Sequence, residues 1–284
     1  MGVSVMLLAA ALPVCDLATN SVNERVAGAD PAVCLSRFVD YPPSRGKLGF
    51  PRCLFEKPFP CNEKFWLKDV DFSCASPWND SCGAERAGTL ISKRHVVFAK
   101  HFTLWKGVRI LFVDQEGEVC PCNVEKTKDI AGTDITVGLL NAEVTPNIHP
   151  AKILPDDFYK HIGDGRGLPI VTLTRKERAV LAEANRIPTN GAPAAVRVRK
   201  PRSAARERLR EEIVGGDSGN PAFLLVGRDL ILLYCLHHGG VGSGPWLHMH
   251  RHEIQAAMDD LCPGYKLEEC DFTKVGATKK GDDR

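Results

Sequence analysis

The sequence lacks a long apolar segment, an internal repeat and a strong net charge. No stretch reaches the roughly 18 consecutive apolar residues of a membrane helix, so we expect no internal membrane span. The formal net charge of +2 indicates no particular charged partner. What is present is globular composition: of 284 residues, 44% are hydrophobic and 25% charged. This length fits one large β domain or two small ones, with extensions.

The N-terminus lacks the basic residues that normally begin a signal peptide. The apolar segment Val3–Val14 has the length of the central part of such a peptide, but no Lys or Arg precedes it. We treat residues 1–18 as a candidate signal sequence; a buried segment or a start site assigned too far downstream are the alternatives. Residues 1–60, rich in Pro, Gly and Cys, are predicted to be an N-terminal extension or pro-segment.

The cysteine count is odd. With 11 cysteines, at least one thiol is free or bridges to another chain. Their spacing is compatible with disulfides, although a sequence does not fix the pairing. Free cysteines in a reducing cytoplasm would look the same. The compartment therefore stays open, with a secreted or periplasmic location favoured over the cytoplasm.

Short apolar runs alternate with turn residues from about Phe65 onward. Val, Ile, Leu, Phe and Thr gather in segments that are typical of an all-β sandwich or a pair of barrels. We expect strand structure at 88–92, 96–98, 108–113, 134–140 and 221–236. Residues 251–261 place apolar side chains at 3.6-residue spacing, which predicts a short helix.

Residues 175–212 interrupt this pattern because they are low in large apolar side chains and dense in arginine. We interpret them as a charged surface insertion, with helical parts at 174–184 and 203–212. A nucleic-acid or acidic partner is the alternative. No aromatic side chains are interleaved with the basic ones to stack on bases, so we expect no nucleic-acid partner.

Three glycines surround one serine in the segment Gly215-Gly216-Asp217-Ser218-Gly219. A serine hydroxyl is a poor nucleophile at neutral pH. It needs a base within hydrogen-bond distance and an acid that holds the tautomer of that base. Glycine permits positive φ angles and leaves room for a substrate. In this turn the N–H groups of Gly216 and Ser218 can converge on one point, where an oxyanion would be stabilised.

Upstream motifs offer the base and the acid. His101 ends the run Val-Val-Phe-Ala-Lys-His, and Asp134 begins the apolar run Asp-Ile-Thr-Val-Gly-Leu-Leu. A carboxylate that leads a buried strand requires a partner. The order and flanks of these motifs resemble the trypsin/chymotrypsin-like serine endopeptidases, from about Phe65 to Leu261. The resemblance is closest to a mostly microbial branch with Gly-Asp-Ser-Gly-Asn-Pro at 216–221 and Gly-Ser-Gly-Pro at 242–245.

The resemblance implies an all-β fold of two packed six-stranded antiparallel β-barrels, with a short C-terminal helix and an N-terminal extension. The peptidase domain would cover 61–265, followed by a C-terminal tail at 266–284. The barrels would lie at about 65–145 and 146–250, with the charged insertion at 175–212 inside the second and the helix at 251–261. The active site would lie in the cleft between the barrels.

The resemblance also implies the roles of the site residues. Ser218 would attack the scissile carbonyl, His101 would take and return the proton, and Asp134 would orient His101. The backbone N–H groups of Gly216 and Ser218 would form the oxyanion hole. The partner would be a polypeptide substrate, with no metal or organic cofactor, and the oligomeric state stays open. Asp217 would support the loop by pairing with a substitute for the N-terminal amine that it pairs with elsewhere in the family.

Several residues depart from the family pattern or leave alternatives open. Lys100 replaces a small residue beside the histidine, and its charge would disfavour a protonated imidazole if directed inward. Glu212 lies where the family has the pocket-floor residue, and a carboxylate there would select Arg or Lys. We favour the alternative that Glu212 simply ends the charged insertion. His237 and His238 end the strand that would flank the pocket and are candidates for substrate contact.

Other histidines compete with His101 for a functional role. His95 is a rival base, although a solvent-facing strand position is the preferred interpretation. His248, His250 and His252 alternate, so on a strand they would share one face and could bind Zn²⁺. An exposed polar edge is the favoured interpretation, because no carboxylate or cysteine at matching spacing completes the site.

The sequence thus predicts a serine endopeptidase. A catalytically silent protease-like binding or scaffold protein is one alternative, and a zymogen that needs N-terminal processing is another. A non-peptidic serine esterase is disfavoured, because the chain order His, Asp, Ser differs from the Ser, Asp, His order of the α/β-hydrolases.

Overall fold

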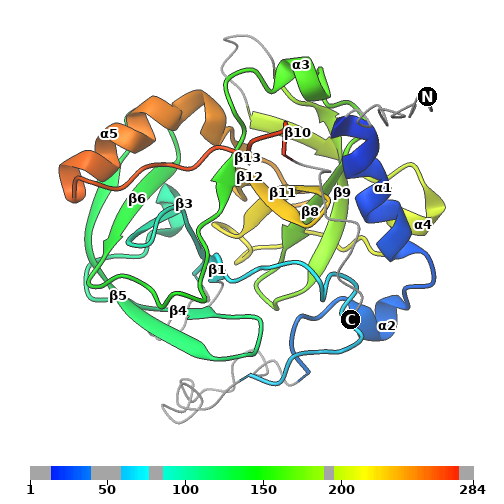
Figure 1. Ribbon diagram of the computed structural model, residues 1–284, viewed down its shortest axis with the longest axis horizontal. Coiled ribbons are helices and arrows are strands. Elements are labelled where there is room, and N and C mark those ends of the chain that lie inside the picture. The colour runs from blue at the N-terminus through cyan, green and yellow to red at the C-terminus, as the bar shows by residue number, and fades with distance from the viewer. Residues whose placement is uncertain (1–13, 40–58, 77–85, 189–194, 275–284) are drawn as a thin grey trace, which may run out of the picture.

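The computed structural model describes residues 14–39, 59–76, 86–188 and 195–274. In these residues the chain is mostly β and forms two sheets, with helix α1 beside the second sheet and helix α5 beside the first (Figure 1). None of the described helices is long and apolar enough to cross a membrane. The predicted all-β character is confirmed at this level.

The first sheet has six strands in the order β1-β2-β3-β6-β5-β4, and all its pairs are antiparallel. Its edge strands β1 and β4 also contact each other, so the sheet is a nearly closed barrel. The strands are β1 Ala75–Ser76, β2 Gly88–Leu90, β3 His95–Ala99, β4 Arg109–Val113, β5 Val119–Asp129 and β6 Ile135–Leu140.

The second sheet has seven strands in the order β13-β10-β9-β8-β11-β12-β7. They are β7 Lys152–Ile153, β8 Pro169–Leu173, β9 Ala179–Arg186, β10 Ala195–Arg199, β11 Pro221–Val226, β12 Asp229–Cys235 and β13 Gly244–Pro245. It differs from the predicted six antiparallel strands, because β7 pairs with β12 in parallel and a seventh strand is present. Two of the strands are only two residues long, too short to leave a periodic pattern in the sequence.

The chain near the C-terminus covers the β7 edge of the second sheet. The N–H of Ile153 donates to the carbonyl of Glu268 at 2.8 Å, and the N–H of Cys270 donates to the carbonyl of Ile153 at 2.9 Å. Cys270 and Phe272 are buried in an apolar cluster formed with residues of the second sheet. These residues of the predicted C-terminal tail therefore pack against the sheet.

The described helices are α1 Val14–Val26, α2 Pro31–Cys34, α3 Tyr159–Ile162, α4 Ala204–Glu207 and α5 Arg251–Leu261, with 3₁₀ turns η2 Lys100–Phe102 and η3 Leu247–His250. Helix α5 has the predicted bounds, and its apolar face packs on β5 and β6. Helix α1 lies against β11, and the N–H of Gly227 donates to Ser21 Oγ at 2.8 Å.

The candidate signal sequence at 1–18 lies mostly outside the described residues. Its last part begins α1, where Val14 and Ala18 are buried in the core of the second sheet.

The predicted helix at 174–184 is wrong. The structure places strand β9 over Ala179–Arg186, paired with β8 and buried over its first six residues. Part of the predicted insertion, namely β9 and β10, therefore belongs to the second sheet, and in the predicted helix at 203–212 only α4 is helical. Ala, Leu and Glu favour a helix locally, but pairing with β8 overrides that preference. The buried Glu183 is matched by Arg199, whose Nε donates to it at 2.9 Å.

The two sheets share one apolar core. A single buried cluster contains Phe98 and Val137 of the first sheet together with Phe223 and Leu225 of the second. The ring of Phe72 meets Phe223 edge to face at 6.0 Å. The sheets are therefore packed together, and loops from both can meet at their junction.

The described cysteines are all free thiols. Nine of the 11 cysteines fall in the described residues, and Cys53 and Cys82 lie outside them. The disulfides that the spacing left open are thus not formed among the described cysteines.

Candidate active site

The pairing of β3 with β6 places His101 beside Asp134. Ala99, the last residue of β3, is opposite Ile135, the first residue of β6. The chain then turns into η2, and the N–H of Lys100 donates to the carbonyl of Asp134 at 3.0 Å. The N–H of His101 donates to Asp134 Oδ1 at 2.8 Å. Backbone hydrogen bonds thus position the Asp134 carboxylate independently of the His101 ring.

The His101 ring bridges Asp134 and Ser218. Its Nδ1 lies 2.7 Å from Asp134 Oδ2, and its Nε2 lies 2.9 Å from Ser218 Oγ. The partners are 33 and 117 residues from His101 in the chain. The structure therefore brings together the three residues that the motifs predicted, with Ser218 supplied by the second half of the chain.

The loop that carries Ser218 depends on its glycines. Gly216 and Gly219 have φ angles of +98° and +86°, which other residues rarely adopt. A side chain at Gly219 would also collide, because its Cβ would lie 2.8 Å from the carbonyl oxygen of Ala87. The serine can approach the first sheet only because this position has no side chain. The predicted oxyanion donors, Gly216 and Ser218, lie on this loop.

Asp217 holds the same loop through hydrogen bonds to its buried carboxylate. It is 1% exposed, and its carboxylate accepts hydrogen bonds from the N–H groups of Arg175 and Val214, each at 2.8 Å. Hydrogen bonds to a charged group contribute about 1.5–3 kcal/mol each. Two backbone amides thus occupy the place of the expected substitute for an N-terminal amine.

The charges around His101 favour an ionised Asp134. Burial raises the pKa of the Asp134 carboxyl, but hydrogen bonds from His237 and His101 outweigh burial and hold that pKa below its ordinary value. Lys100 does not supply a free charge to the site, since its Nζ pairs with Asp129 Oδ2 at 3.0 Å.

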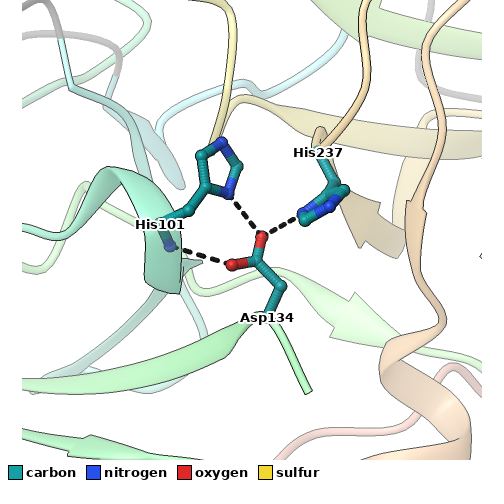
Figure 2. A group of neighbouring side chains, drawn as sticks. All are labelled: His101, Asp134 and His237. Atoms are coloured by element: carbon teal, nitrogen blue, oxygen red, sulfur yellow. Dashed lines mark hydrogen bonds and ion pairs between the residues drawn. The ribbon is translucent and has the colours of Figure 1, made fainter.

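His237 makes a contact that the sequence analysis missed. It was expected to contact substrate, but its Nδ1 is hydrogen-bonded to Asp134 Oδ2 (Figure 2). Its ring lies 4.8 Å from that of His101, at 80°. The available signal was the position of His237 just after β12, whose continuation binds the serine loop: the N–H of Leu236 donates to the carbonyl of Asn220 at 2.8 Å.

The other predicted substrate-binding residues, His238 and Glu212, are both exposed. The ring of His238 packs against His237 at 4.1 Å, and its N–H donates to the carbonyl of Ser243 at 3.2 Å. Glu212 is exposed, and the adjacent Glu211 pairs with Arg178 at 2.8 Å.

The structure also corrects the position predicted for His95 and the strand predicted for His248, His250 and His252. The solvent-facing position expected for His95 is wrong: it is fully buried, and its Nδ1 lies 2.8 Å from Ser92 Oγ. Burial lowers the pKa of His95 to about 4. His248, His250 and His252 do not lie on a strand, because this segment is η3 followed by α5. His248 is buried, with Nδ1 3.0 Å from the Leu154 carbonyl.

In this arrangement His101 can act as a base toward the hydroxyl of Ser218. With Asp134 holding a proton on Nδ1 of His101, Nε2 offers its lone pair to the hydroxyl of Ser218. The ring is 41% exposed, so a substrate can reach it.

No protein-family model matches the chain, and no curated protein matches its sequence.

Proposed function

We propose that the protein is a serine endopeptidase that cleaves polypeptides through Ser218, His101 and Asp134. The observation that carries the proposal is the His101 ring, with one nitrogen 2.7 Å from a carboxylate oxygen and the other 2.9 Å from a serine hydroxyl. These are the contacts that a base needs in order to activate a nucleophile.

The reaction follows from these contacts. Ser218 Oγ attacks the peptide carbonyl while His101 Nε2 takes its proton, and Asp134 stabilises the imidazolium. The N–H groups of Gly216 and Ser218 receive the oxyanion. His101 then protonates the leaving amine, which leaves an acyl group on Ser218. Water, activated by the same nitrogen, releases the acid and restores the site.

The proposal includes the two-barrel architecture of the chymotrypsin-like fold. It is supported by the nearly closed first sheet, the second sheet packed against it, and a site built from loops of both. The buried Asp217, which ties the serine loop to Arg175 and Val214, supports it further.

Labelling with a fluorophosphonate probe tests the proposal. The probe forms a covalent bond with an activated serine, so wild type should be labelled whereas Ser218→Ala and His101→Ala should not. Ser92→Ala is the matched control, because Ser92 is also hydrogen-bonded to a histidine but is buried in the turn before β3. It should be labelled as fast as wild type.

The other outcomes distinguish the alternatives. If wild type is not labelled, the chain is a zymogen or a catalytically silent binding protein. Trimming the N-terminal extension (residues 1–60) in steps that begin with 1–13, and repeating the experiment after each step, separates these two, since only a zymogen would gain labelling. Label that persists in Ser218→Ala would place the reactive group elsewhere and overturn the proposed roles.

A further inference from the structure

Two imidazoles converge on one carboxylate oxygen at the candidate active site. Nδ1 of His101 and Nδ1 of His237 both face Asp134 Oδ2, and Figure 2 shows the two rings approaching it from different sides. Their donor atoms all lie within 4.8 Å of one another. Among the described residues, this is the cluster of His, Cys, Asp or Glu whose geometry suits a metal ion.

The donor set selects the kind of metal. Two imidazole nitrogens and one carboxylate oxygen are the ligands of open Zn²⁺ sites, with bonds of about 2.0–2.2 Å and a fourth position for water. Mg²⁺ and Ca²⁺ prefer oxygen ligands alone. Tetrahedral bonds of that length put the ligand atoms about 3.4 Å apart. The 2.7 Å between His101 Nδ1 and Asp134 Oδ2 must therefore lengthen by less than about 1 Å, a small side-chain rotation.

The site is also accessible to an ion from solvent. The side chains of His101 and His237 are 41% and 30% exposed, while Asp134 is mostly buried at 16%. A cation from solvent can therefore reach the two imidazoles that face the Asp134 carboxylate (Figure 2).

We propose that this trio binds Zn²⁺ and that the bound ion reversibly switches off Ser218. A metal that binds Nδ1 of His101 displaces the proton from that nitrogen to solvent, and Nε2 takes up a proton from solvent, so the ring stays neutral with its single proton on Nε2. Nε2 faces Ser218 Oγ at 2.9 Å. It then donates a hydrogen bond to the serine instead of accepting its proton, and the base is gone. The inhibitory part of this proposal rests on the proposed peptidase function, whereas the metal site does not.

Zinc titration of the metal-free full-length chain, followed by calorimetry, tests the site without any reference to activity. Wild type should bind one Zn²⁺ per chain at the trio, and Mg²⁺ should not compete. His237→Ala and His237→Gln should each weaken this binding at least about tenfold, since each removes one of three ligands. The glutamine keeps a donor for Asp134, which covers the case in which the alanine variant fails to fold.

His149 provides the matched control. Its Nδ1 lies 2.7 Å from Asp71 Oδ2, so it repeats the histidine–carboxylate pair without a second imidazole on the carboxylate. His149→Ala should bind Zn²⁺ as tightly as wild type. Equal binding by wild type and both His237 variants, or loss of binding in His149→Ala alone, would overturn the proposed site.

Fluorophosphonate labelling then tests the switch. Zn²⁺ should suppress labelling of wild type over the concentration range in which it binds, EDTA should restore it, and His237→Gln should need at least about tenfold more Zn²⁺. Full labelling of zinc-saturated wild type would overturn the switch. Absence of labelling even in EDTA would count against the proposed peptidase, while the calorimetric result would still decide the metal site.

Discussion

The two ends of strand β3 each hold a histidine hydrogen-bonded to a serine hydroxyl. At the first end, His95 lies 2.8 Å from Ser92 Oγ; just beyond the second, His101 lies 2.9 Å from Ser218 Oγ. His95 is fully buried, and among the described residues no side chain is hydrogen-bonded to its Nε2. His101 is partly exposed, and a carboxylate occupies its other nitrogen. A histidine–serine pair is thus not enough for nucleophilic chemistry, which also needs access and a third group that fixes the tautomer.

The largest expected effect comes from removing that third group. Asp134→Asn should lower kcat by about 10⁴-fold, because an amide no longer holds the His101 proton on Nδ1. The measurement is the initial rate with a fluorogenic peptide chosen from a library. Ser92→Ala, at the buried end, should keep the wild-type rate. An Asp134→Asn variant whose rate stays within tenfold of wild type would show that the carboxylate does not account for the difference between the two ends.

A smaller effect is expected at the buried end, where His95 should make the free energy of unfolding depend on pH. Burial lowers the pKa of folded His95 to about 4, whereas the unfolded residue titrates near 6.5. Between these values the unfolded state binds the extra proton, so acid favours unfolding. His95 therefore stabilises the fold fully above pH 6.5, and this contribution is lost as the pH falls to 4, at up to about 1.4 kcal/mol per pH unit.

Denaturant unfolding of wild type and His95→Asn across pH 4 to 7 measures this contribution. The asparagine can still bond to Ser92 but does not titrate, so its unfolding free energy should fall less steeply with acid. Parallel curves would mean that His95 is not the source of the acid sensitivity.

The smallest effect is expected for Lys100, beside the exposed end. Its Nζ pairs with Asp129, and both side chains are nearly half exposed. Such pairs contribute about 0–1 kcal/mol. Lys100→Ala should therefore change the unfolding free energy by less than about 1 kcal/mol and the fluorophosphonate labelling rate by less than about twofold. A large change in the labelling rate would indicate that the lysine charge reaches His101 after all.

The parts of the fold that the sequence predicted are those with a local signature. The helix at 251–261 follows from its 3.6-residue apolar spacing, and β6 follows from an apolar run broken only by Thr136 and Gly138. The serine turn follows from its glycines, because closely spaced glycines indicate backbone positions with a positive φ. Gly216 and Gly219 have such angles. Each of these signals is contained within a few neighbouring residues.

The parts that were missed depend on distant residues. Strand β9 has helix-favouring residues and becomes a strand only by pairing with β8. The burial of His95 follows from α5 and its continuation, where Tyr265 packs edge to face on its ring at 5.3 Å. The contact of His237 with Asp134 spans 103 residues. No local sequence pattern encodes these contacts, because they depend on strand pairing and on how the two sheets pack.

The short pairing of residues 268–270 with β7 has a consequence for the behaviour of the chain in concentrated solution. An open edge strand offers unpaired N–H and C=O groups on which another chain can add. Here Glu268 and Cys270 satisfy both backbone groups of Ile153, and the burial of Phe272 holds the segment down. A chain cut before Glu268 would expose that edge and gain a route to intermolecular sheet extension. By pairing with Ile153, residues 268–270 therefore block the addition of another chain at this edge.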